Sequence, residues 1–413
     1  MPTLLRLVKR GDHPDFLDLP WDRGLADWVH PRLVDMVQGV ARHVVRFVAY
    51  GDRVYALKET DDASARREYE ALRELAELRL PAVDAVGLVT SRTGGRDDQL
   101  GSMLITRYLD FSLPYRYLYG REGGPGLDRR LIDAAVVLLV RLHLEGVYWG
   151  DCSLSNVLFR RDAGALSAYL VDAETAEQHP TLSDALREND LDIAAENFAG
   201  GLADAVAAGD ADVDPLAAAE RLVERYHGLW TELTSTEEVG EHDVHRIEQR
   251  VRRLHELGFD VEELAIESAA DREGSRLRIQ PTVVEEGHHS RELRRLTGLE
   301  VQENQARRLL DDIAAFGAYL SRLNGAEVPL AVAAARWLTD VYQPLLDAVP
   351  PELRWRLEPA ELFHELLEHR YFLAEEQGVD VSNEDALASY VSSVLPFRPD
   401  ERLLLREDDL PRQ

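Results

Sequence analysis

Five polar side chains in the first half of the chain have the types that one reaction needs together. They are Lys58, Glu68, Asp151, Asn156 and Asp172. Phosphoryl transfer needs a cation on the phosphates of a nucleotide, a group that fixes this cation, oxygen ligands for magnesium, and a carboxylate that orients the attacking hydroxyl. A lysine paired with a glutamate supplies the first two roles. Magnesium prefers carboxylate and amide oxygens, which Asp172 and Asn156 offer, and Asp151 remains to accept the hydroxyl proton.

Lys58 stands out because lysine is nearly absent from the chain. The sequence contains 47 basic residues, of which only Lys9 and Lys58 are lysines. Coding bias explains most of this preference for arginine. A compact ammonium group is nevertheless not interchangeable with a planar guanidinium, so a lysine in an arginine-rich chain marks a position worth inspecting. Lys9 lies near the N-terminus, whereas the neighbourhood of Lys58 calls for inspection.

The strand and helix that carry Lys58 and Glu68 can be predicted from the hydrophobic pattern. Residues 44–50 and 54–58 are rich in β-branched and aromatic side chains around a Gly-Asp turn, which indicates a β-hairpin with Lys58 near its end. Residues 63–80 have helical periodicity, and Glu68 falls inside the apolar arc. A carboxylate on a buried face needs a partner, and Lys58 on the preceding strand is the candidate.

The remaining polar side chains follow predicted strands. Further strands are expected at 33–37, 85–91, 100–108, 156–159 and 168–171. A helix at 128–145 is apolar over most of its circumference, which predicts a central position in its domain. Asp151 with Asn156, and Asp172 with Glu174, therefore lie at the ends of neighbouring short strands.

The order Lys, Glu, Asp-x-x-x-x-Asn and Asp resembles the signature of the protein-kinase superfamily. Asp151-Cys-Ser-Leu-Ser-Asn156 followed by Tyr-Leu-Val-Asp172 carries most of this likeness, because spacing and strand context both agree. The details are more similar to bacterial lipopolysaccharide-kinase-like proteins than to eukaryotic protein kinases. Residues 33–205 also resemble the kinase-like part of an actinobacterial family of unassigned function (DUF4032-type), whose pattern the C-terminal half shares.

The resemblance implies ATP and Mg²⁺ as cofactors. Lys58 would bind the α- and β-phosphates and Glu68 would orient it, while Asn156 and Asp172 would hold the metal. Asp151 would orient or deprotonate the acceptor hydroxyl.

The nucleotide base is expected against the strand end at 106–109, with Thr106 and Tyr108 as candidate contacts. No G-x-G-x-x-G loop precedes the lysine, and Gly39 is the best single glycine in its place. Phosphate binding is therefore expected to rest on Arg42, His43 or the lysine.

Other departures from the superfamily pattern bear on the acceptor. Trp149-Gly150 replaces the His-Arg pair, and Asp172-Ala173-Glu174 replaces Asp-Phe-Gly. Glu174 is either a further metal ligand or an ordinary solvated glutamate. No Ala-Pro-Glu landmark follows, and a helix resumes by about residue 182 or 191, which leaves little platform for a peptide. We therefore expect a small-molecule, sugar or lipid acceptor.

Each of the five residues has an ordinary structural explanation. Lys58 and Glu68 alone would be a structural ion pair, and Asp151 and Asn156 alone would be turn residues. Five such residues in the right order make coincidence a poor explanation. The same fold also hosts non-catalytic nucleotide-binding proteins. The sequence thus supports two hypotheses, an ATP-dependent phosphotransferase and a pseudokinase that acts as a regulatory or protein-interaction module.

Composition excludes several other classes. The chain has 413 residues, 76 of them acidic, a formal net charge of -29 and one cysteine. A single cysteine excludes a disulfide framework and any cysteine-based zinc or iron–sulfur site. The negative charge argues against nucleic-acid partners, because the average surface field repels phosphate, but it permits a nucleotide in a local pocket. No apolar run approaches the ~20 residues of a transmembrane helix, so we expect a cytoplasmic protein.

The C-terminal half is predicted to be mainly helical, with one strand at 277–285. Helices are expected at 215–235, 242–257, 291–323, 329–348, 359–377 and 383–395. His364 and His369 are five positions apart and diverge around their helix, which disfavours an H-E-x-x-H zinc protease.

One polar cluster in this half is a candidate site for an anionic substrate. Its members are His288, His289, Asn304, Arg307 and Arg308. The alternative, which we prefer, is a cap between helices in which the histidines have hydrogen-bond partners.

We therefore predict an α+β, bilobal protein-kinase-like fold with an additional mainly α-helical C-terminal domain. The expected segments are a lead-in at 1–32, a β-rich N-lobe at 33–110, a helical C-lobe with the catalytic loop at 111–208, and the C-terminal domain at 215–413. The identity of the acceptor and the oligomeric state do not follow from the sequence.

Overall fold

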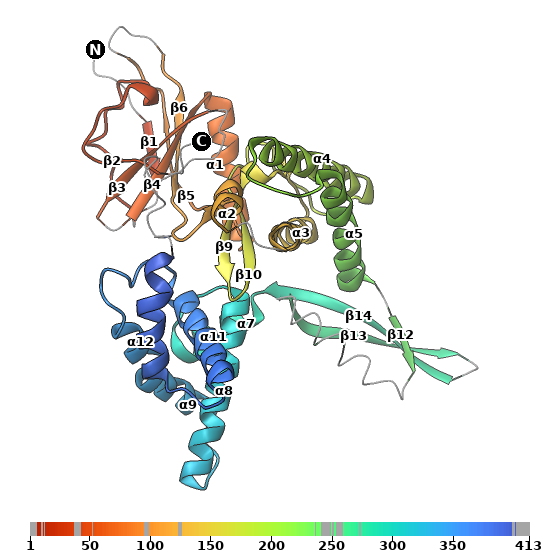
Figure 1. The fold of residues 1–413 in the computed structure, drawn as a ribbon. Helices are drawn as coiled ribbons and strands as arrows, with labels where there is room; N and C mark the ends of the chain where they lie inside the picture. Colours follow the sequence, from red (N-terminus) through yellow and green to blue (C-terminus); the bar gives the residue numbers. More distant parts are fainter. Residues whose placement is uncertain are drawn as a thin grey trace. The chain divides into compact units, whose positions relative to one another are not determined.

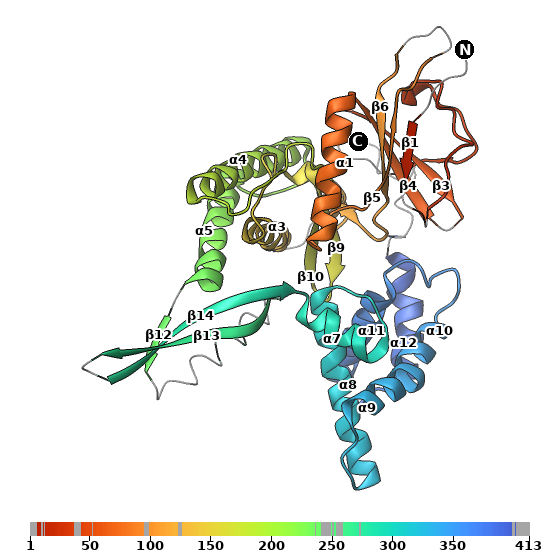
Figure 2. The same cartoon turned by 180° about the vertical axis from the view of Figure 1, so that it is seen from behind.

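The structure is a computed structural model that separates into two compact units (Figures 1 and 2). It describes residues 6–9, 11, 13–36, 43–51, 53–94, 99–122, 126–235, 237–240, 249, 252, 259–271, 274–398 and 401. Unit 1 comprises residues 1–160, 166–225 and 401–413, and unit 2 comprises residues 161–165 and 226–400. Among the helices that are described, none is long and apolar enough to cross a lipid bilayer.

Unit 1 begins with an antiparallel six-stranded sheet of order β1-β5-β6-β4-β3-β2. Its strands are β1 (Arg6–Lys9), β2 (Leu33–Val34), β3 (Val44–Tyr50), β4 (Arg53–Thr60), β5 (Ala85–Thr90) and β6 (Ser102–Arg107). The predicted hairpin is β3–β4, in which Val45 is paired with Lys58. On its other side, Lys58 is paired with Leu104 of β6, so the lysine lies on an inner strand of the sheet.

Helix α1 (Asp62–Glu77) follows β4 directly and packs beside the sheet (Figure 1). The side chain of Asp61 accepts hydrogen bonds from the main-chain N–H groups of Ala63 and Ser64, which satisfies two free donors of the first turn. The buried face of α1 includes Leu72 and Leu75. Glu68 lies on this face and is only 2% exposed, as its position in the apolar arc predicts.

The segment before the hairpin is packed into the N-terminal sheet of unit 1. Phe16, Trp21, Leu25 and Trp28 are all buried in one cluster with side chains of the strands. The sequence predicted an extended lead-in at 1–32, and the local pattern did not reveal this packing because the aromatic residues have no helical or strand periodicity. Arg92, whose side chain is completely buried, donates to the main-chain oxygen of Trp21 and ties the segment to the sheet.

The second part of unit 1 is mainly helical. Its elements are β7 (Leu113–Pro114), α2 (Tyr115–Glu122), α3 (Leu127–Leu144), β8 (Val147–Tyr148), β9 (Val157–Asp162), β10 (Ala165–Leu170), β11 (Glu177–Gln178), α4 (Asp184–Ala208) and the start of α5 (Pro215–Thr234). Helix α3 buries side chains around most of its circumference, which agrees with its predicted central position. Strands β9 and β10 form the hairpin between the loop of Asp151 and the loop of Asp172.

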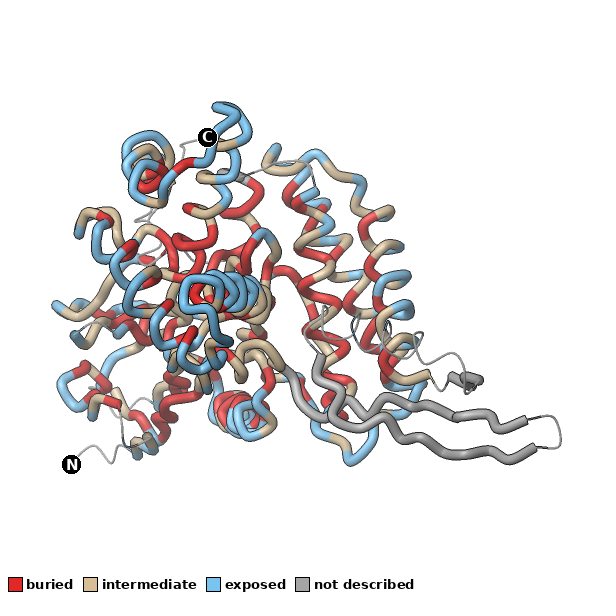
Figure 3. Tube along the Cα trace, turned by 90° about the horizontal axis from the view of Figure 1, so that it is seen from below, coloured by how far each residue is buried: buried red, intermediate tan, exposed pale blue. Residues whose placement is uncertain are grey.

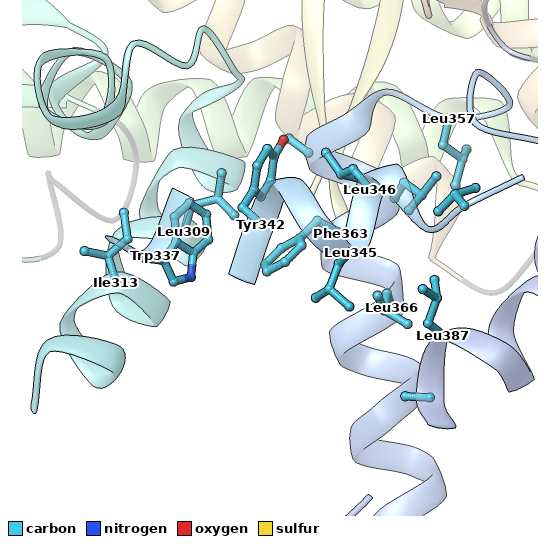
Figure 4. Packing of buried hydrophobic residues seen from close by; sticks show 14 of the residues in the cluster. Leu309, Ile313, Trp337, Tyr342, Leu345, Leu346, Leu357, Phe363, Leu366 and Leu387 are labelled. Atoms are coloured by element: carbon cyan, nitrogen blue, oxygen red, sulfur yellow. The ribbon is translucent and has the colours of Figure 1, made fainter. Parts of the chain in front are cut away.

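Unit 2 is built mainly from helices, as predicted. They are α7 (His288–Thr297), α8 (Glu303–Asn324), α9 (Leu330–Trp337), a π-helical turn (Leu338–Tyr342), α10 (Gln343–Asp347), α11 (Pro359–Gln377), α12 (Asn383–Ser393) and a final 3₁₀ turn (Leu395–Phe397). Trp337, Tyr342 and Phe363 contact one another within the core of this unit, with ring centroids 5.0 to 5.5 Å apart (Figure 4). Buried and exposed positions alternate along helices (Figure 3), as expected when one face packs inward.

Three strands of unit 2 form a separate antiparallel sheet of order β12-β14-β13. They are β12 (Glu237–Gly240), β13 (Phe259–Asp271) and β14 (Gly274–Glu286). Strand β14 contains the predicted strand 277–285, but neither β12 nor β13 was predicted. Strand β13 shows one reason. Its register shifts between Asp260 and Glu263 interrupt the alternation that marks a strand. The predicted helix at 242–257 lies outside the described residues, except for residues 249 and 252.

Residues 161–165, the tip of the β9–β10 hairpin, are held in unit 2 by buried polar groups. The carboxylate of Asp162 accepts from the main-chain N–H of Gln305 at 2.7 Å and from Nδ2 of Asn304 at 3.0 Å. Glu361 accepts from the main-chain N–H of Ala163 at 2.9 Å and from Nε2 of Gln305 at 3.0 Å. Burial raises the pKa of Glu361 above its ordinary value, although these hydrogen bonds oppose the shift.

These elements confirm the predicted fold class, a β-rich N-terminal lobe, a helical lobe and an additional, mainly helical C-terminal region. Two helix boundaries agree closely, since α11 has the predicted bounds and α5 ends one residue early. The single helix predicted at 291–323 is wrong, because the chain leaves α7 at Gly298 in a left-handed conformation and α8 begins only at Glu303. The helix predicted at 329–348 is divided by the π-helical turn into α9 and α10. The sequence placed the boundary between the helical lobe and the C-terminal domain at 208–215, and this boundary stays a prediction. The first compact unit of the structure extends further, to Arg225.

Candidate active site

Lys58 lies among three carboxylates of unit 1, one on helix α1 and two in the loop after β10. Its Nζ is 3.0 Å from Oε2 of Glu68 on α1 and 2.7 Å from Oδ2 of Asp172 after β10. Oε2 of Glu174 is 3.6 Å away. A strand, a helix and a loop thus converge on one ammonium group, and three of the five predicted residues are brought together here.

The surroundings shift the pKa values of Lys58 and Glu68 in a way that keeps the lysine charged. Burial raises the pKa of Glu68 to about 7, and the charge of Asp172 adds to the rise while Lys58 opposes it. Burial acts against the charge of Lys58, but the attraction of Glu68 and Asp172 raises its pKa above the ordinary value. One cation among several carboxylates leaves a negative site that attracts a further cation.

Asp151 is held on both carboxylate oxygens by side-chain amides. Nδ2 of Asn156 donates to its Oδ2 at 3.1 Å and to its main-chain oxygen at 3.0 Å. Nδ2 of Asn197 on α4 donates to Oδ1 at 3.2 Å. Because Asn156 donates through nitrogen, its Oδ1 is left as the atom that can accept or coordinate.

Asp190 of α4 fixes the loop that carries Asp151. Its carboxylate is fully buried and accepts from the main-chain N–H groups of Trp149 at 2.7 Å and Gly150 at 2.8 Å. Nε2 of His143 lies 3.1 Å from the same carboxylate, and burial lowers the pKa of this histidine although Asp190 opposes the shift. The loop therefore has a fixed main chain immediately before Asp151.

Asp190 and Asn197 were not predicted from the sequence, although a signal was present. Asp190 lies among the buried positions of α4, which also include Leu191, Ala194 and Phe198. The argument that singled out Glu68, a carboxylate inside an apolar arc, applies equally to Asp190. Asn197 lies seven residues further, about two helical turns along the same side.

The loop of Asp151 and the loop of Asp172 are joined to each other through Trp149. Its indole Nε1 donates to the main-chain oxygen of Asp172 at 3.0 Å, and its own main-chain oxygen accepts from Oγ1 of Thr175 at 2.8 Å. The main-chain N–H of Val171 donates to the main-chain oxygen of Asn156 at 3.0 Å. These bonds place Asp151, Asn156 and Asp172 in neighbouring loops of one site.

The oxygen atoms gathered here fit a divalent metal ion. Single carboxylate oxygens of Glu68, Asp172 and Glu174 lie within 4.8 Å of one another. The main-chain N–H of Glu174 donates to Oδ1 of Asp172 at 3.1 Å, which fixes the turn between them. Carboxylate oxygens, together with the amide oxygen that Asn156 offers on the neighbouring loop, are the donor chemistry that magnesium prefers.

The predicted nucleotide contacts are only partly described. Gly39 and Arg42 lie outside the described residues. Thr106 lies in β6, and Tyr108 just after it is buried, with its ring 5.8 Å from that of Phe47. The main-chain N–H of Tyr108 already donates to Val54 at 2.9 Å, so a base contact through this amide would have to replace a bond of the N-terminal sheet.

The candidate anion cluster of the C-terminal half lies in unit 2. His289 donates its main-chain N–H to Oε1 of Glu303 at 2.8 Å, and its Nδ1 is 2.7 Å from the same oxygen. The ring of His288 packs edge-on against His289. Hydrogen bonds from His289 and Ser290 lower the pKa of Glu303 despite the opposing effect of burial.

The two arginines of this cluster lie on α8. Nη2 of Arg307 is 3.4 Å from Oδ1 of Asn304, and Arg308 is exposed. The contacts of His289 are those of a cap between α7 and α8, the alternative that the sequence analysis preferred.

Two family models match separate parts of the chain. Residues 52–219 match the lipopolysaccharide kinase (Kdo/WaaP) family, and residues 228–395 match a domain of unknown function, DUF4032. The second match begins close to Tyr226, where the main segment of unit 2 begins. Both resemblances predicted from the sequence are thereby confirmed, and the first match supports a phosphotransferase. No curated protein matches the chain.

Two solved structures are similar to parts of the chain. One is described as WaaP in complex with acyl carrier protein, with 20% identity and a TM-score of 0.34, covering 54% of this chain and 89% of that chain. The other is an aminoglycoside-3'-phosphotransferase of type VIII, with 16% identity and a TM-score of 0.33, covering 49% and 88%.

Proposed function

We propose that the protein is an ATP-dependent phosphotransferase that moves the γ-phosphoryl group to a hydroxyl of a non-peptide acceptor. The observation that carries the proposal is the position of Lys58 between Glu68 and Asp172, at 3.0 and 2.7 Å. A structural ion pair needs one carboxylate, whereas this lysine has two and a third at 3.6 Å. The match to a lipopolysaccharide kinase family favours a sugar or lipid-linked sugar as acceptor.

In this mechanism the chain positions reactants and stabilises charge. Lys58 binds the α- and β-phosphates, and Glu68 keeps its ammonium group in place. Asn156 and Asp172 would hold Mg²⁺, with Glu174 as a further candidate ligand. The metal ion, when bound, offsets the negative charge of the phosphates.

Asp151 acts on the acceptor. Its carboxylate accepts the proton of the acceptor hydroxyl as the oxygen forms a bond to the γ-phosphorus. The bond between this phosphorus and the bridging oxygen breaks, and its electron pair leaves with ADP. The fixed loop of Trp149 and Gly150 keeps Asp151 in position, because Asp190 holds both of their amide groups.

The direct test is magnesium-dependent ATP turnover in the wild type and in Asp151→Asn. The substitution keeps the shape of the side chain and removes the proton acceptor, so kcat should fall roughly 10²- to 10⁴-fold. Asp192→Asn is the matched control, because Asp192 is exposed on the same unit and should leave turnover unchanged. Acceptors for the assay should include sugars, lipid-linked sugars and water.

The competing hypothesis is a pseudokinase that binds a nucleotide without transferring phosphate. The replacement of Asp-Phe-Gly by Asp172-Ala173-Glu174 favours this alternative. A thermal shift with Mg-ATP but no turnover or autophosphorylation with any acceptor would favour it. Unit 2 would then be proposed as a protein-interaction module. Absence of both binding and turnover would contradict both hypotheses.

A further inference from the structure

The carboxylate of Asp151 accepts hydrogen bonds from two side-chain amides, which come from different elements. Asn156 belongs to the same loop, and its Oδ1 is the atom proposed to coordinate the metal ion. Asn197 comes from α4, and its Nδ2 donates to Oδ1 of Asp151 at 3.2 Å. Neither the family resemblance nor the sequence pattern assigned a role to Asn197.

Asn197 also binds the main chain next to Asp151. Its Nδ2 donates to the main-chain oxygen of Cys152 at 3.2 Å. One amide nitrogen with two hydrogens therefore bridges the side chain of Asp151 and the peptide group that follows it. Such a bridge fixes the rotation of the carboxylate relative to its own loop.

The position of Asn197 on α4 explains how it reaches this loop. Asp190 lies about two helical turns earlier and binds the amides of Trp149 and Gly150. Helix α4 thus holds four consecutive residues, 149–152, from one side. Of the two helix residues, Asp190 binds main-chain amides, whereas Asn197 reaches the carboxylate itself.

A neutral amide suits this position. It orients an acceptor oxygen through a hydrogen bond without placing a positive charge beside the carboxylate. Asn156 would bind Asp151 through its nitrogen and the metal ion through its oxygen. Asn197 has no such second role in the proposed mechanism, so its amide serves to orient the carboxylate of Asp151.

We infer that Asn197 is a positioning residue for the transfer step, because its side chain holds the carboxylate of Asp151 toward the acceptor hydroxyl. This inference rests on the proposed function. A misplacement of about 1 Å in a reacting group can reduce the rate ~10²-fold. Loss of Asn197 should therefore affect kcat far more than nucleotide binding.

The test uses the full chain and Mg-ATP with water as the acceptor. Asn197→Leu removes both hydrogen bonds with little change of volume, and we expect kcat to fall roughly 10- to 100-fold while the KM for Mg-ATP changes less than about twofold. Asn189→Leu is the matched control, since Asn189 is exposed on the same helix and accepts from the hydroxyl of Tyr148, away from the carboxylate of Asp151. It should behave as the wild type.

A double-mutant cycle separates positioning from a merely structural role. If Asn197 acts through Asp151, Asn197→Leu should change the residual kcat of Asp151→Asn by less than about threefold. A full additional loss in that background, or a wild-type kcat in Asn197→Leu, would overturn the inference. Asn197→Ser, which keeps a small donor, gives the same comparison if the leucine variant does not fold. Absence of wild-type turnover with water, sugars and lipid-linked sugars alike would instead refute the proposed function, and this inference with it.

Discussion

The indole N–H of Trp149 donates to the main-chain oxygen of Asp172 over 3.0 Å, and the side chain of Trp149 is completely buried. This bond joins the loop before Asp151 to the loop that carries Asp172. A tryptophan thus connects the proposed proton acceptor with the proposed metal ligand through one hydrogen bond.

Replacement of this tryptophan should loosen both loops. Trp149→Phe removes the indole donor and leaves the oxygen of Asp172 without this partner, which should lower the free energy of unfolding by about 1–3 kcal/mol. Turnover of Mg-ATP should also fall. Urea denaturation and the turnover assay measure the two effects. The control is Trp355→Phe, because Trp355 is 45% exposed and its replacement should cost less. An unchanged stability of Trp149→Phe would contradict the role of the bond.

Glycine at position 150 is required by backbone conformation and by space. Its φ is +77°, and a Cβ there would lie 2.9 Å from the ring of Tyr148. Gly150→Ala should cost about 1–2 kcal/mol for the left-handed conformation, with a further cost for the clash and a fall in turnover. Gly51→Ala is the control, because Gly51 has φ +65° and nothing within 4 Å of a Cβ. Equal losses of stability for the two variants would show that the contact with Tyr148 has no effect.

Removal of the charge of Lys58 should make stability more dependent on pH. The pKa of Glu68 is about 7 in the folded protein against 4.5 ordinarily, so the folded state keeps a proton that the unfolded state has lost. Stability therefore falls as pH rises through this window. In Lys58→Met the pKa of Glu68 should rise further, so the fall should continue above pH 7. Urea denaturation from pH 6 to 9 should show that the free energy of unfolding of Lys58→Met falls increasingly below that of the wild type. This difference should grow by at most about 1.4 kcal/mol per pH unit.

The comparison for this variant is Lys58→Met combined with Glu68→Gln. The double variant has no buried acid to titrate at this position, so its loss of free energy of unfolding relative to wild type should vary less with pH. Mg-ATP turnover should be lost in both variants. A constant deficit of Lys58→Met across this pH range would contradict the coupling of the two side chains.

The buried carboxylate at the tip of the β9–β10 hairpin should stabilise unit 2. Asp162→Ala leaves the donors of Gln305 and Asn304 without this acceptor, which should cost about 1–3 kcal/mol for each donor that stays buried. Asp162→Asn keeps one acceptor oxygen and should cost less. Thermal unfolding measures both. Asp311→Ala is the control, because Asp311 is exposed on α8, and a loss as large as that of Asp162→Ala would refute the assignment.

Glu303 should stabilise the junction of α7 and α8 only when it is ionised. Its folded pKa lies below the ordinary value of 4.5, so its contribution is present above pH 4.5 and disappears as pH falls through the folded pKa. Glu303→Gln should therefore lower Tm at pH 7, and the difference from wild type should shrink in acid. The control Glu300→Gln, at a side chain 72% exposed, should show a small difference at every pH. A difference that grows in acid would contradict the sign.

Local pattern predicted much of the fold. The bounds of α11 and of β3 follow from periodicity and β-branched content, and the burial of Glu68 follows from its place in an apolar arc. The same arc argument would have found Asp190. Strand β13 was missed because its register shifts hide the alternation of a strand.

The sequence by itself determined which side chains are available for phosphoryl transfer, since residue types and their order carry that information. Only the tertiary structure decided which of them meet. Asn197 reaches Asp151 across 46 positions, and Lys58 reaches Asp172 across 114. Hydrophobic periodicity reports which face of an element is buried, but it carries no information about which distant element covers that face. Pairing of this kind depends on the packing of whole elements, and it became visible only in the folded chain.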